Sequence, residues 1–84
     1  MNPIVKQYIN YKINNFSAED LYRLSKVYEL KLTKDQAKKV INILRQEKVD
    51  IGNQIQINHL LKQIGSNVGK EIEIKIRYLL KTLL

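Results

Sequence analysis

The chain has no cysteine, one histidine and three glycines in 84 residues. Without cysteine it can form neither a disulfide nor a thiolate metal site, which fits a reducing compartment such as the cytosol. His59 has no second histidine with which to share a metal ion, and no carboxylate stands three or four positions from it. The glycines at positions 52, 65 and 69 are isolated and form no phosphate-binding loop. These absences argue against metal and nucleotide chemistry.

Long apolar runs are also missing. No stretch approaches the roughly 18 apolar residues that cross a membrane, and Lys6, Gln7 and Asn10 interrupt the place where a signal peptide has its apolar centre. We therefore expect a cytoplasmic protein without membrane contact. The few acidic side chains stand mostly at predicted helix starts and turns, where the helix dipole already accounts for them. We accordingly expect no enzyme: no catalytic residue, metal, cofactor or small-molecule substrate.

Positive charge, by contrast, is abundant. Lysine and arginine number 15 against 8 acidic residues, and the formal net charge is +7. On so small a chain this favours polyanionic partners, either nucleic acid or an acidic protein. A hydrophobic content of 44% is enough for one core, and the length predicts a single domain over residues 1–84.

Capping residues open three segments of the chain: Ser17, Thr33 and Asn53. Asp20 and Gln36 stand three positions after the first two caps and complete a capping box in each case. Apolar residues follow each cap at helical spacing. The pattern predicts helices over about 18–29, 34–47 and 54–64.

Four further details concern helix ends and faces. Asn2 and Pro3 predict the start of a first helix, which we expect to end at residues 14–15. The spacing of Ile4, Tyr8 and Tyr11 predicts that they face the core. Gly65 is expected to end the helix that follows Asn53, in the left-handed conformation, and residues 66–67 to restart the chain. Ile43 is expected on the surface of the helix that follows Thr33.

The last segment is ambiguous. Residues 71–78 alternate strictly between polar and apolar side chains, which is a strand pattern. A longer helical template overrides it, made by Ile72, Ile76, Leu79, Leu80 and Leu83. We therefore predict an all-α fold, a compact bundle of four to five short helices around a central capped hairpin of the second and third helices. The alternative is an α+β fold with a short C-terminal strand.

The third predicted helix carries a candidate nucleic-acid site. Lys34, Lys38 and Arg45 fall on one stripe of it, and Lys31 precedes it. Residues 31–48 hold six basic and two acidic side chains. Such a stripe could contact a phosphate backbone, with affinity that depends on salt and not on sequence. The alternative is an ordinary solvated helix face.

A second candidate surface lies on the outer face of the last helix. This face mixes basic with apolar side chains: Lys70, Ile74, Arg77, Tyr78 and Lys81. It suits a partner helix, a second copy of the chain or nucleic acid, although scattered apolar residues are normal on surfaces. We predict a small non-enzymatic binding or adaptor protein, with weak nucleic-acid binding through the third helix as the specific form. The alternative is a protein–protein interaction module or homodimer that uses the last helix.

Two resemblances bear on these predictions. Residues 16–45 resemble the helix–extended turn–helix modules of the SAP and Rho-N type, many of which bind nucleic acid, although Glu29-Leu30-Lys31 replaces the usual turn glycine. The chain more extensively resembles the YqfT-like family of small uncharacterised proteins of Gram-positive bacteria. The residues that carry this resemblance are Asn2-Pro3-Ile4, 11–14, 17–21 and 32–37. The likeness is weaker beyond Asp50. It implies a cytosolic bacterial protein and provides no catalytic or binding residue.

Overall fold

The computed structural model describes residues 2–83, with only the backbone of Leu83. Within this range the chain forms five helices and no strand: α1 (Pro3–Asn15), α2 (Ala18–Val27), α3 (Lys34–Leu44), α4 (Gln54–Asn67) and α5 (Lys70–Leu83). The all-α prediction is confirmed. Because residues 71–78 belong to α5, the alternative with a C-terminal strand is wrong. Ile72, Ile76, Leu79 and Leu80 of the predicted helical template all lie on α5. The side chain of Leu83 is outside the described part of the chain.

The helices begin where local capping chemistry dictates. At α2, Ser17 Oγ accepts a hydrogen bond from the Asp20 amide at 3.0 Å, and the Asp20 carboxylate accepts one from the Ser17 amide at 3.0 Å. Thr33 and Gln36 form the same reciprocal pair at α3, with both distances 3.0 Å. Asn53 caps α4 through the Gln56 amide. These starts confirm the predictions made from residue type and spacing alone.

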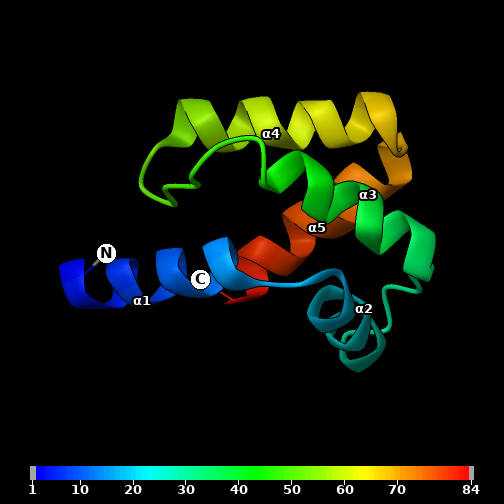
Figure 1. Cartoon of the computed structure of the whole chain (residues 1–84), viewed down its shortest axis with the longest axis horizontal. Coiled ribbons are helices and arrows are strands. Elements are labelled where there is room, and N and C mark those ends of the chain that lie inside the picture. The colour runs from blue at the N-terminus through cyan, green and yellow to red at the C-terminus, as the bar shows by residue number, and fades with distance from the viewer. Residues whose placement is uncertain (1, 84) are drawn as a thin grey trace.

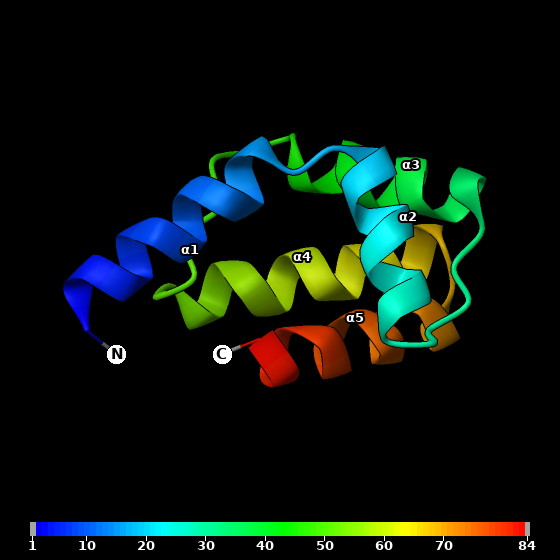
Figure 2. The same cartoon turned by 90° about the horizontal axis from the view of Figure 1, so that it is seen from below.

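The five helices form a compact bundle with α1 at one side. α4 and α5 run antiparallel side by side, and α3 packs against both α2 and α4 (Figures 1 and 2). α2 and α3 are in contact as expected but cross steeply instead of lying antiparallel (Figure 2). Val40, Leu60 and Ile64 are at most 1% exposed and mark the centre of the core.

The apolar face of α1 points away from the core, so this prediction is wrong. Ile4, Tyr8 and Tyr11 are 76%, 60% and 65% exposed. The inward side of α1 carries Asn10 and Asn14 instead, next to Ile13, which packs against the core. Asn14 donates to the Val49 carbonyl at 2.9 Å and accepts from the Val49 amide at 2.8 Å, while Asn10 accepts from the Ile51 amide at 2.7 Å. The partly buried backbone of the 49–51 loop needs these partners, and the two amides supply them.

Two other corrections concern α3 and α4. Ile43 is 6% exposed, because α3 is covered on more than one side, by α2 and by α4. α4 continues through Gly65 to Asn67, so Gly65 is not its end. The end is made by Gly69, whose φ of 150° no other residue type adopts readily. The amides of Val68 and Gly69 both donate to the Ile64 carbonyl, and α5 starts immediately afterwards. α3 also ends at Leu44, earlier than expected.

Gly65 has a different role: it lets α5 approach α4. A methyl group at this position would overlap the carboxylate of Glu73. Glu73 is 3% exposed and is held by Arg77 Nε at 2.9 Å and Lys70 Nζ at 3.2 Å. The hydrogen bond from Arg77, followed by that from Lys70, holds the pKa of the Glu73 carboxyl below its ordinary value of 4.5 although burial opposes this.

A lowered pKa makes stability depend on pH. The charged form of Glu73 stabilises the fold above the pKa of the unfolded chain, and this contribution is lost as the pH falls through the lower, folded pKa. We expect the urea midpoint to be flat above about pH 5 and to fall below it. Glu73→Gln should make this fall smaller, and Asp20 and Asp50, whose pKa values are lowered by hydrogen bonds from the Ser17 and Gly52 amides, account for the rest. The control is Glu71, which pairs with Lys75 on the exposed side of the same helix. Glu71→Gln should leave the fall of the urea midpoint unchanged. Equal pH profiles for Glu73→Gln and the unaltered chain would contradict the assignment.

Candidate nucleic-acid interface

The link between α2 and α3 brings basic side chains from two helices to one end of the molecule. Leu30 and Leu32 are 8% and 4% exposed, whereas Lys31 between them is exposed. Glu29 and Lys31 adopt the left-handed conformation, with φ of 57° and 59°. Each such residue costs about 1–2 kcal/mol when it is not glycine. Burial of the two leucines offsets this cost, so the missing turn glycine does not prevent a tight reversal, and Lys31 is left facing solvent.

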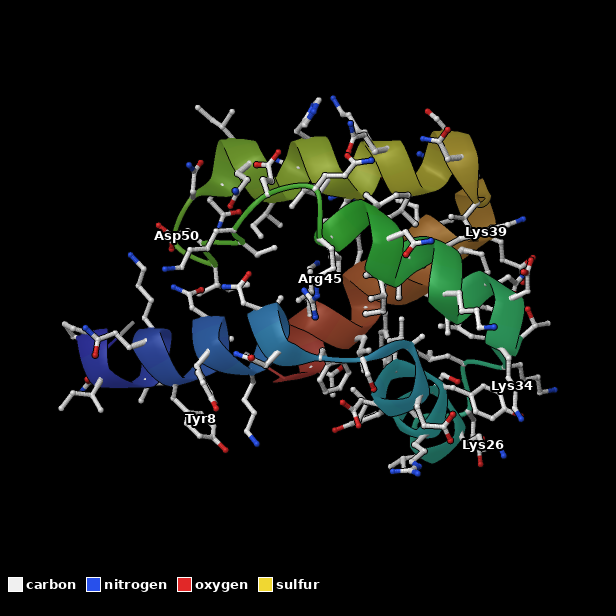
Figure 3. The ribbon with its side chains drawn as sticks, viewed as in Figure 1. Tyr8, Lys26, Lys34, Lys39, Arg45 and Asp50 are labelled. Carbon is white, nitrogen blue, oxygen red and sulfur yellow. The ribbon has the colours of Figure 1, made fainter. Side chains whose placement is uncertain are left out.

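Tyr22 stands between the two helices and gathers two of the lysines. The Lys26 Nζ lies 4.4 Å from the centroid of the Tyr22 ring, and the Lys34 Nζ lies 5.5 Å from it. Both distances suit a cation–π interaction. Lys26 comes from α2 and Lys34 from α3, and Figure 3 shows them at the same end of the molecule. The Tyr22 ring therefore lies within cation–π range of one ammonium group from each helix.

The basic cluster, defined as Tyr22 with Lys26, Lys31, Lys34 and Lys38, retains its positive charge. All four lysines are exposed, and none of them takes part in an ion pair among the described residues. Two of the neighbouring carboxylates have other partners, whereas the exposed Glu29, between Lys26 and Lys31 in the sequence, takes part in no ion pair among the described residues. Asp35 pairs with Lys39 at 3.3 Å, and Glu19 pairs with Arg23 at 3.6 Å. The cluster thus presents unneutralised ammonium groups to solvent.

Arg45 does not belong to this cluster. Its guanidinium Nη2 donates to the carbonyl of Phe16, the C-cap residue that follows α1. Figure 3 shows Arg45 away from Lys34, directed into the space between α3 and α1. The predicted stripe is therefore split: Lys31, Lys34 and Lys38 remain available at one end of α3, and Arg45 ties α1 to the other end.

Sequence reasoning missed Tyr22 and Lys26. The available signal was their i, i+4 spacing on α2, which places a cation over a ring on the same helix face. The arrival of Lys34 from α3 depends on how the two helices cross, and no local spacing encodes that.

The outer face of α5 is less charged than its sequence suggests. Lys70 and Arg77 are both bound to the buried Glu73, and Arg77 Nη1 also donates to Asn58 Oδ1 at 3.2 Å. Ile74 and Tyr78 are 58% and 56% exposed. Together with Lys81 and Arg77 they line a groove of about 650 Å³ between α4 and α5. This face combines an apolar edge with one unpaired lysine, Lys81, among its described residues.

Comparison with known proteins defines the family. A family model described as "Protein of unknown function (DUF2624)" matches residues 1–84. The chain belongs to the DUF2624 family. It is also 36% identical over 70 residues to the uncharacterized protein YqfT of Bacillus subtilis (strain 168), and the alignment covers 83% of each chain. The resemblance to YqfT-like proteins is thereby confirmed, and the family match extends past Asp50 to the last residue. No solved structure matches the chain significantly.

Across the part that the structure describes, no three histidine, aspartate or glutamate side chains are grouped so that they could hold a metal ion. His59 lies exposed on α4. Among the described residues, the helices are too short or too polar to cross a membrane.

Proposed function

We propose that this chain is a small non-enzymatic binding protein of the cytoplasm that contacts the phosphate backbone of a nucleic acid through the basic cluster. The observation that supports this most directly is the convergence of Lys26 and Lys34 on one aromatic ring. Ammonium groups that have no ion pair among the described residues attract a phosphate placed beside them. The two remaining lysines of the cluster extend the same positive surface along α3 and the link before it.

The chemistry of the cluster favours backbone contact over base recognition. Lysine ammonium groups act as compact point charges and lack the rigid planar fork of arginine, which makes them less selective for one base. The face of Tyr22 is already occupied by ammonium groups and is a poor platform for a stacked base. Binding is therefore expected to be salt-dependent and to show little preference for sequence.

Fluorescence anisotropy with labelled single- and double-stranded DNA and RNA tests this proposal. Between about 50 and 200 mM salt, affinity should fall steeply, because each phosphate contact contributes about 0.7–0.9 to the slope of log K against log salt. Replacing Lys26 and Lys34 together with glutamine should lower that slope by about 1.5. The fold should be retained, since both side chains are exposed.

A matched control separates a local site from net charge. Lys48→Gln with Lys62→Gln removes the same charge from exposed lysines that have no ion pair among the described residues and lie outside the cluster. This double variant should bind nearly as the unaltered chain does. Equal losses in the two double variants, or none in either, would reject the cluster as the site.

The exposed Ile74 and Tyr78 support the second candidate function, a protein interaction module or homodimer that uses the outer face of α5. An apolar interface responds little to salt. The two functions therefore separate in the same titration: phosphate binding weakens as salt rises, whereas association through α5 persists.

A further inference from the structure

An apolar cavity lies between α1 and the rest of the bundle. Its volume is about 430 Å³, and side chains from all five helices line it. α1 contributes Ile9 and Ile13 to the wall, and the opposite wall includes Leu24 of α2 and Leu80 of α5. This volume is within the range of about 300–1,000 Å³ that is typical of small-molecule sites. In an 84-residue chain, so large an apolar space beside the core is a substantial loss of packing.

Polar contacts hold α1 beside the bundle, together with the packing of Ile13 and Phe16 against the core. Asn10 and Asn14 bind the backbone of Val49 and Ile51 at 2.7–2.9 Å. Lys6 adds an ion pair with Asp50 at 3.6 Å. These directional contacts fix α1 against the 49–51 loop. Beside these polar contacts, the half-buried Ile9 and Ile13 face the cavity.

The lining specifies the chemistry of the occupant. Lys12 is the charged side chain among the described lining residues, and the other members are apolar or aromatic. Its Nζ lies 5.6 Å from the centroid of the Tyr8 ring, and among the described residues no carboxylate forms an ion pair with it, although Asp20 interacts with it from a longer distance. Both side chains are exposed, so the cation stands at the rim, next to water. An apolar interior with one cation at its rim complements an apolar chain that ends in one negative charge.

We propose that this cavity binds a single-chain aliphatic anion of the fatty-acid class. The hydrocarbon chain lies among Ile9, Ile13, Leu24 and the facing residues of the bundle. The carboxylate lies outside, beside the ammonium group of Lys12. This site is separate from the basic cluster, and the inference does not depend on the proposed nucleic-acid binding.

Decanoate, at concentrations below those at which it forms micelles, is the probe. Calorimetric titration should show saturable binding of about one decanoate per chain, and decanoate should raise the thermal unfolding midpoint. Lys12→Gln should weaken decanoate binding roughly fivefold, the effect of one partly exposed ion pair. It should leave the binding of decanol unchanged. Lys62→Gln, an exposed lysine that does not line the cavity, is the control and should change neither.

Filling the cavity gives the second arm of the test. Ile13→Phe adds volume from α1 and Leu24→Phe adds it from α2, and each should abolish the binding of both decanoate and decanol. Circular dichroism identifies the variants that fold, and either one is sufficient.

Three results would overturn the proposal. Undiminished decanoate binding in a folded filled variant would indicate adsorption elsewhere. Equal affinities for decanoate and decyltrimethylammonium would show that the site does not select a negative charge, which contradicts the proposed contact with Lys12. A doubled mass in sedimentation without decanoate binding would mean that a second copy of the chain covers the cavity.

Discussion

Replacing Ile64 with alanine is expected to lower the free energy of unfolding by about 2–5 kcal/mol. Ile64 is 0% exposed and lies at the centre of the core on α4. Truncation removes buried methyl and methylene groups and leaves a space that rigid neighbouring helices cannot close. A domain of this size has a total stability of about 5–15 kcal/mol, so one such change can remove a large share of it.

Urea unfolding followed by circular dichroism measures this loss. Ile55→Ala is the matched control, because Ile55 lies on the same helix and is 84% exposed. Its effect should remain within about 0.5 kcal/mol, as is usual for surface substitutions. If the two variants unfolded at similar urea concentrations, the position of α4 in the bundle would be wrong.

The second large effect is expected at Gly65. An added methyl group overlaps the Glu73 carboxylate, and that carboxylate cannot move freely because Arg77 and Lys70 hold it. Gly65→Ala should therefore destabilise the chain by about 1–3 kcal/mol, the usual range for overpacking. In an exposed helix interior the same change would instead stabilise by about 0.5–1 kcal/mol.

A double-mutant cycle distinguishes these two causes. With Glu73→Ala in place, the overlapping oxygen is absent and the remaining Cβ is 3.4 Å from the new methyl group, an ordinary contact. Gly65→Ala should then be neutral or stabilising by up to about 1 kcal/mol. Four urea midpoints complete the cycle. A destabilisation of the same size in both backgrounds would show that the carboxylate is not the obstacle.

Local rules predicted the starts of the helices because caps act over three residues. Ser17 with Asp20 and Thr33 with Gln36 need no tertiary context to be recognised, and both boxes form. The end of α4 shows the limit of such rules. Gly65 and Gly69 both satisfy the local signal for a helix end, and only the approach of α5 explains why the first of them lies inside the helix.

Faces and sites were harder to predict because they depend on neighbours distant in sequence. The inward side of α1 is set by two asparagines that bind a loop 35–41 residues further along the chain. An apolar stripe is the usual guide to a buried face, and here polar amides override it. The basic cluster differs from the stripe predicted on α3, since Arg45 is held by the Phe16 carbonyl and Lys26 joins from another helix. Nothing in the spacing of one helix reports such contacts.

The way α1 is attached has a consequence for the order of folding. The packed pairs α2–α3, α3–α4 and α4–α5 join helices that follow each other in the chain, so they close short loops and can form early. The bonds from Asn10 and Asn14 span much of the sequence and bury little apolar surface. α1 should therefore dock last and detach first, as a separate cooperative unit whose opening requires less free energy than global unfolding. The native protein then consists of a persistent four-helix body and a helix that exchanges its amide protons ahead of the rest.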